Sequence, residues 1–167
     1  MLNDAVGSSV ADSYVTLEQY TDYAQAMGWQ DEIVTCPAQA ALRRAAMAID
    51  RLYSAKGTRT DAAQALAWPR TGVSLDGHIL ASDTIPKAVQ SAQCEMARLI
   101  LNGADPFAAP PEQRITKRRE RVDVLEEETE YEATGQAASY PAVNSLLTGL
   151  IHPKGGHLPF SVPLTRV

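Results

Sequence analysis

The sequence has 167 residues but only two cysteines and three histidines, which leaves little material for disulfides or a metal site. Cys36 and Cys94 lie far apart, each at or within an expected helix, so we expect reduced thiols and no disulfide. A structural zinc ion takes four ligands at short paired spacings, and the histidines provide only one close pair, His152 and His157. We therefore expect no metal and no cofactor.

Long apolar runs and catalytic motifs are also missing. No stretch approaches the roughly 18 apolar residues of a membrane span, and residues 1–13 lack a basic segment followed by an apolar run. We therefore expect a soluble protein, made in the cytosol, that contacts no membrane. No serine or cysteine stands in a nucleophile motif, and no glycine-rich loop joins a strand to a helix. The chain is not expected to be an enzyme.

A net positive charge is absent too, because the formal net charge is −5 and the pI is about 5.2. This charge opposes binding to nucleic acid phosphates unless the basic residues gather on one face. One basic run, residues 114–121, is followed by the glutamate-rich residues 126–130. Folded back on each other, these halves would place basic residues opposite acidic ones, so we predict a two-stranded β-ribbon over about residues 114–132.

Two interpretations of this ribbon segment stay open. A helix competes with the ribbon, because Glu, Lys and Arg are good helix formers. The basic half is a nucleic-acid candidate, although self-neutralised strands are the interpretation we favour. An isolated hairpin is marginal in water, so the ribbon should pack against its own core or against a neighbouring subunit. The candidate residues for a subunit interface or for nucleic acid are Lys117, Arg118, Arg119 and Arg121.

The rest of the pattern predicts a mainly α fold, a small helical bundle core with the ribbon and an extended C-terminal arm appended. The helices are expected at residues 16–27 and 37–56, from residue 85 or 86 to 102, and in a short final segment that starts within residues 139–141 and runs through 147 or 150. The two long helices flank residues 57–72, in which Pro69 prevents Trp68 from continuing a helix. We expect Trp68 to be the core anchor. An Asp-Gly turn signal within residues 75–79 indicates a small hairpin.

The chain is expected to divide into an N-terminal arm (1–13), a helical domain (14–150) and a C-terminal tail (151–167). Residues 137–167 contain two basic and no acidic side chains, so the tail is positive. Its last part alternates apolar and polar residues, which predicts a strand that completes its own sheet or adds to that of a partner. The residues expected to bind that partner are Leu158, Phe160, Val162, Leu164 and Arg166.

Several short blocks follow one another along the chain: Ser13-Tyr14-Val15-Thr16-Leu17-Glu18, Ala41-Leu42-Arg43-Arg44-Ala45, Lys56-Gly57-Thr58-Arg59, Leu66-Ala67-Trp68-Pro69-Arg70, Ile85-Pro86 and Tyr140-Pro141-Ala142-Val143. In this order they resemble a protein family of tailed phages, labelled DnaT-like single-stranded DNA-binding proteins and similar to head-tail connector adaptors. The resemblance covers about residues 13–150, and its most specific block is Leu66-Ala67-Trp68-Pro69-Arg70.

The resemblance implies two functions. The main hypothesis is a structural head-to-tail adaptor in the virion neck, assembled in the host cytoplasm as a ring that is expected to be dodecameric. It would join the portal protein to a downstream tail-completion protein, with double-stranded DNA passing through its acidic lumen without specific binding. In that case the tail residues 158–166 would contact the portal or a neighbouring subunit. The alternative is a single-stranded DNA-binding replication accessory protein.

Overall fold

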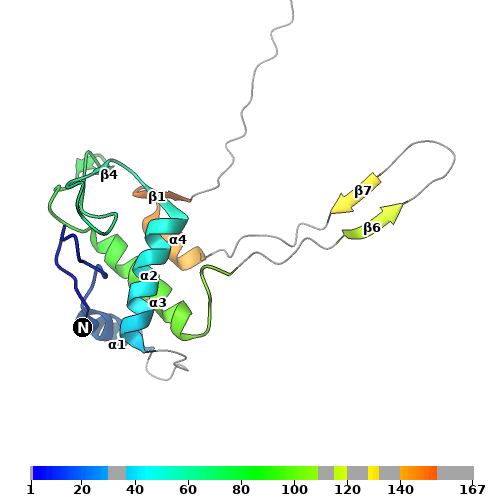
Figure 1. Cartoon of the computed structure of the whole chain (residues 1–167), viewed down its shortest axis with the longest axis horizontal. Helices are drawn as coiled ribbons and strands as arrows, with labels where there is room; N and C mark the ends of the chain where they lie inside the picture. The colour runs from blue at the N-terminus through cyan, green and yellow to red at the C-terminus, as the bar shows by residue number, and fades with distance from the viewer. Residues whose placement is uncertain (1, 30–36, 109–114, 120–127, 132–139, 154–167) are drawn as a thin grey trace, which may run out of the picture.

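The computed structural model describes residues 2–29, 37–108, 115–119, 128–131 and 140–153, and all structural statements below concern these residues. They form four helices and four two-stranded antiparallel sheets, so the fold is helix-rich but mixed. In Figure 1, α2 lies at the centre of the domain and packs against α3, which in turn packs against α4. The helices are α1 (Leu17–Ala26), α2 (Ala38–Leu52), α3 (Lys87–Leu101) and α4 (Pro141–Leu147).

The four predicted helices are confirmed, and small residues explain how the two long ones pack. The inner face of α2 is rich in alanine, so α3 can approach closely. The buried residues of α2 are Ala41, Leu42, Ala45, Ala46, Ala48 and Ile49. The buried residues of α3 include Val89, Ala92, Met96, Ala97 and Ile100. Helix α1 begins with the predicted capping box, in which Thr16 and Gln19 satisfy each other's backbone N–H groups.

A buried glutamine ties the segment before α1 to both long helices. Gln93 on α3 is fully buried, and its Oε1 accepts a hydrogen bond from the backbone N–H of Tyr14 at 2.9 Å. Its Nε2 donates to Ser13 Oγ at 2.8 Å and to the carbonyl oxygen of Leu42 at 2.9 Å. Because every donor and acceptor has a partner, the amide is buried without an unsatisfied group.

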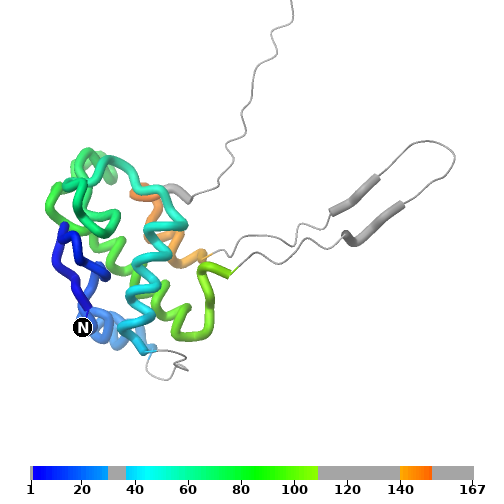
Figure 2. The backbone as a smooth tube through the Cα atoms, viewed as in Figure 1, coloured from blue at the N-terminus to red at the C-terminus, as the bar shows by residue number. Residues whose placement is uncertain are grey.

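The prediction that the long helix continues to residue 56 is wrong. Helix α2 ends at Leu52, and β1 (Tyr53–Ala55) follows at once, paired with β8 (Ile151–Pro153). The backbone N–H of Lys56 continues this contact by donating to the carbonyl oxygen of Leu150 at 3.0 Å. Pairing with a distant segment therefore outweighs the local helix propensity, and Ile151, expected in the tail, belongs to the buried core. In Figure 2 the segment before it, α4, is drawn in orange as part of the helical domain.

Short strands also fill the bridge between the long helices. Strand β2 (Thr58–Arg59) pairs with β3 (Arg70–Thr71), and β4 (Ser74–Leu75) pairs with β5 (His78–Ile79). The predicted hairpin is confirmed: Asp76 and Gly77 have φ values of 51° and 83°, as a tight hairpin turn requires. A mainly α fold was therefore too simple a prediction, because residues 53–79 contribute five strands.

The predicted β-ribbon is confirmed in its two strands, β6 (Ile115–Arg119) and β7 (Glu128–Tyr131). Their antiparallel register places Lys117 opposite Glu130 and Arg119 opposite Glu128, so basic positions face acidic ones along the ladder. The competing helix prediction is wrong for these strands. Arg121 lies outside the described residues. The same holds for the predicted partner-binding residues Leu158, Phe160, Val162, Leu164 and Arg166.

The block with the most specific resemblance closes the core. Trp68 is 1% exposed and belongs to the hydrophobic cluster, and the Trp68–Pro69 peptide bond is cis. The guanidinium of Arg70 donates to the carbonyl oxygens of Lys56 and Gly57, each at 2.6 Å, and to that of Ala67. Arg70 thus holds three backbone carbonyls, so its role in this block is to position the loop.

Candidate nucleic-acid interface

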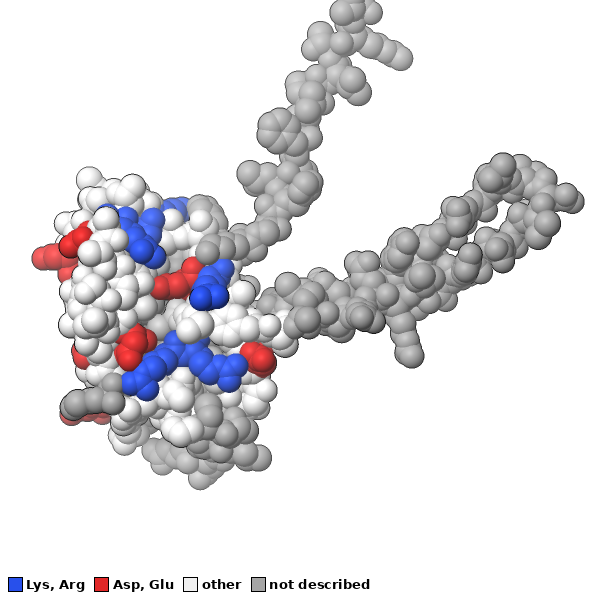
Figure 3. Space-filling view, in the orientation of Figure 1, with Lys and Arg blue, Asp and Glu red and all other residues white. Residues whose placement is uncertain are grey.

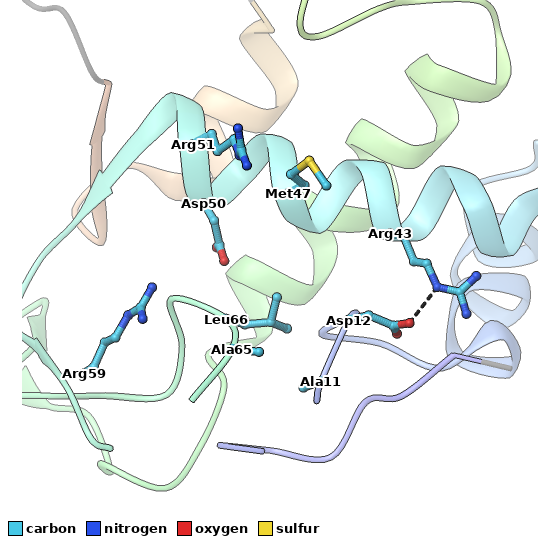
Figure 4. Close-up of a pocket in the computed structure, with 9 residues that line it drawn as sticks. All are labelled: Ala11, Asp12, Arg43, Met47, Asp50, Arg51, Arg59, Ala65 and Leu66. Carbon is cyan, nitrogen blue, oxygen red and sulfur yellow. Dashed lines mark hydrogen bonds and ion pairs between the residues drawn. The ribbon is translucent and has the colours of Figure 1, made fainter. Parts of the chain in front are cut away.

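The outer side of α2 forms one wall of a groove of about 460 Å³. Arg43, Met47 and Arg51 follow one another at intervals of four residues, so they form one row along this side of the helix. The opposite wall comes from three segments, β2 with Arg59, the loop residues 65–66, and residues 11–12. In Figure 4 the side chain of Arg59 extends from this opposite wall toward α2.

The floor of the groove is a hydrogen-bond network around Asp50. Its carboxylate accepts a hydrogen bond from the hydroxyl of Tyr14 and another, at 2.9 Å, from the backbone N–H of Ala67. The same N–H also lies 3.1 Å from the Tyr14 hydroxyl oxygen. Burial raises the pKa of Tyr14 well above its ordinary value, and the adjacent Asp50 charge raises it further. Asp50 is therefore held by donors of the protein itself.

The second acidic residue of the groove is held in a similar way. Asp12 Oδ2 lies 2.6 Å from Arg43 Nε, and Asp12 Oδ1 accepts from the backbone N–H of Asn3 at 2.7 Å. Partial burial alone would raise the pKa of the Asp12 carboxyl. The hydrogen bonds from Arg43 and Asn3, together with the Arg43 charge, lower this pKa below its usual value. Asp12 is thus a paired carboxylate that fixes the N-terminal segment against α2.

Two arginines of the groove make no ion pair with any described residue. Arg51 and Arg59 are exposed, and neither has an ion pair within the part of the chain that the structure describes. Arg59 makes one long hydrogen bond, from Nη1 to the carbonyl oxygen of Gln64 at 3.4 Å. Arg44, next to the groove, is paired with Asp105 at 2.9 Å. Figure 3 shows basic side chains gathered over the α2 face with acidic ones among them.

The residues predicted from the sequence lie elsewhere. Lys117, Arg118 and Arg119 are on β6, and Trp68 is in the core, so none of them lines this groove. The groove was not predicted from the sequence. The available signal was the spacing of Arg43 and Arg51 on either side of Met47, but nothing in the sequence showed that residues 59 and 65–66 lie opposite them.

An aromatic cluster lies at a different place, beside α1 and α3. Arg98 lies over the ring of Trp29, with Cζ 4.4 Å from the ring centroid. Tyr23 packs against the same ring edge-on, and the two ring centroids are 5.4 Å apart. None of the described residues that line the groove is aromatic. The groove therefore offers arginines and aliphatic surface, and the Trp29 ring beside α1 and α3 is covered by an arginine on one face.

Two further searches of the described residues gave negative results. No helix among them is long and apolar enough to span a lipid bilayer. They also contain no group of three or more histidine, cysteine, aspartate or glutamate side chains that could hold a metal ion.

Comparison with known proteins identifies the family. A family model described as "Putative DnaT-like ssDNA binding protein" matches residues 1–167. The chain belongs to this family. The family label expected from the sequence blocks is thereby confirmed, over the whole chain and not only over residues 13–150. No curated protein and no solved structure matches the chain.

Membership of the DnaT-like family corrects the main functional prediction. The head-to-tail adaptor hypothesis is wrong on this finding, which agrees with the alternative instead. Its partners, namely the ring of subunits, the portal, the tail-completion protein and duplex DNA in a lumen, are withdrawn with it. The error came from weighing the net charge of the whole chain against DNA binding, although the charge of one face decides contact with phosphates. The location in a virion stays an untested prediction.

Proposed function

We propose that this chain binds single-stranded DNA. The observation that carries the proposal is the match of the DnaT-like family model to all of its residues. The proposal is of a binding protein, and the expectation that the chain is not an enzyme stays a prediction.

The charge distribution gives physical support. Arg43, Arg44 and Arg51 lie on α2, and Arg59 lies across the groove from this helix. Phosphate contacts by arginine and lysine supply most of the affinity in non-specific binding of nucleic acids. Of the two acidic residues among the described lining of the groove, Asp12 is compensated by its ion pair with Arg43, and Asp50 accepts hydrogen bonds from Tyr14 and Ala67. An acidic protein can thus present a local face that attracts DNA.

Binding can be measured by fluorescence anisotropy with a labelled oligothymidine of about 20 nucleotides, which exceeds the roughly 4 to 16 nucleotides that one single-strand-binding domain covers. We expect binding at low salt that weakens as salt increases, with a log–log slope of about −0.7 for each phosphate contacted. An unlabelled duplex of the same length serves as competitor and should compete poorly. Absence of binding at low salt would refute the proposal, and equal competition by the duplex would limit it to general polyanion binding.

A further inference from the structure

Resting on the proposed function, we infer that the DNA strand lies in the groove beside α2. In this arrangement Arg51 and Arg59 bind backbone phosphates from the two walls, and the bases contact Met47 and Leu66. The site differs from the basic strand β6, which was the only nucleic-acid candidate found in the sequence.

Arg51 and Arg59 make no ion pair with any described residue, unlike the other arginines on this side of the protein. A guanidinium that already holds a carboxylate must give up that partner before it binds a phosphate, whereas an unpaired one need not. Arg43 is paired with Asp12, and Arg44 with Asp105. Among the described residues Arg51 and Arg59 have no such ion pair, and they stand on opposite walls of one groove. A strand lying between them could be contacted from both sides.

Apolar side chains lie between the arginines of the groove. Met47 is 45% exposed, and it lies midway between Arg43 and Arg51. At 1.5 Å of rise per residue these two arginines are about 12 Å apart along the helix. The half-buried Leu66 lines the other wall. Methionine adapts its shape to flat partners, and bases present their faces to it only when they are unpaired.

Contacts within the protein already hold the groove in shape. Tyr14 and Ala67 hold Asp50 at the floor, and the Asp12–Arg43 pair holds the N-terminal segment at one end (Figure 4). A ligand that enters a preformed site does not have to order it, so less of its binding free energy is lost. Two of the three basic positions of β6, Lys117 and Arg119, by contrast, stand opposite glutamates in the strand register.

The decisive variant is the double substitution Arg51→Ala/Arg59→Ala, compared with Arg44→Ala. Arg44 is on the same helix and carries the same charge, but it is paired with Asp105 and does not line the groove. Loss of two phosphate contacts should reduce the salt slope by about 1.4 and weaken oligothymidine binding about 25-fold at about 0.1 M salt. Arg44→Ala should change the affinity much less. Met47→Glu places a negative charge among the bases and should also weaken binding, without removing any cation.

The outcomes separate this inference from the proposed function. If the wild-type chain does not bind oligothymidine, the proposed function itself fails. If the wild type binds and the double variant loses no more affinity than Arg44→Ala does, the groove is not the site. A third variant, Lys117→Ala/Arg118→Ala/Arg119→Ala, tests β6, and loss of binding in this variant alone would assign the DNA to the ribbon. Far-ultraviolet circular dichroism checks that each variant is folded, and Arg51→Ala alone replaces the double variant if that does not fold.

Discussion

Truncation of Trp68 tests whether this side chain closes the core. The indole is 1% exposed and belongs to the same buried cluster as residues of α2, α3 and α4. Trp68→Ala would remove the whole ring system and leave a cavity. The surrounding helices are closely packed, so they can fill this cavity only in part.

The magnitude can be estimated from the buried area. A tryptophan buries about 150 to 250 Å², which at about 25 cal/mol per Å² amounts to about 4 to 6 kcal/mol as an upper bound. Truncations of large aromatics in protein cores cost about 3 to 5 kcal/mol. The Nε1–H of Trp68 is buried without a hydrogen-bond acceptor among the described residues. Leaving such a donor unpaired costs about 1 to 3 kcal/mol, and truncation removes this penalty, so we expect a loss near 3 kcal/mol.

Trp68→Phe is the matched control, because it keeps an aromatic ring and removes only the unpaired donor and part of the area. Its cost should be below about 1 kcal/mol, since the smaller ring loses burial while the N–H penalty is relieved. Urea unfolding followed by circular dichroism gives both free energies, and Trp29 remains as a fluorescent reporter in both variants. A cost below about 1 kcal/mol for Trp68→Ala would refute the core role. A cost well above about 1 kcal/mol for Trp68→Phe would refute the argument about the indole N–H.

Three further predictions concern the loop and the floor of the groove. Tyr14→Phe removes one of the hydrogen bonds that Asp50 accepts, while the bond from the Ala67 N–H remains, and should lower the free energy of unfolding by about 1.5 to 3 kcal/mol in urea titrations, the range for a hydrogen bond to a charged group. Gly57→Ala should destabilise the fold much more than Gly72→Ala in thermal scans: both have positive φ, but only at Gly57 would the new Cβ collide with a backbone carbonyl. The pKa of Asp12 is lower in the folded than in the unfolded protein, so its carboxylate stabilises the fold above the unfolded-state pKa of about 3.9, and this stabilisation is lost as the pH falls below that value. Asp12→Asn should therefore match the stability of the wild type only at low pH.

The helices could be predicted from the sequence because their determinants are local. Thr16 and Gln19 form a capping box within four residues, and Gly103 directly follows the last turn of α3 and its cap. The Asp76-Gly77 turn is equally local, because its backbone angles depend on these two residues. In each case the pattern and the hydrogen bonds that it predicts lie within a few positions of each other.

The strands of residues 53–59 and 70–71 could not be predicted, because their partners are far away in the sequence. Tyr53 stands at the end of a strong helical pattern, and only pairing with residues 151–153 converts it to a strand. Arg70 shows the same limit for side chains. Its sequence neighbours indicate a turn, but nothing in them shows that its guanidinium holds the carbonyls of Lys56 and Gly57. Such contacts depend on the path of the whole chain.

The net charge of −5 is a poor guide to the charge that one face of this chain presents to a phosphate. Charges separated by more than about 8 to 10 Å are largely screened at moderate salt, so a phosphate responds to the few groups around it. Around the groove, Asp12 and Asp105 are each taken up by an arginine, and Asp50 is held by Tyr14 and a backbone N–H. The sequence counts these carboxylates as repulsive, whereas the fold turns them to internal partners and leaves arginines on the surface. Local pairing therefore decides whether this acidic chain can attract a DNA strand, and that pairing follows from tertiary structure.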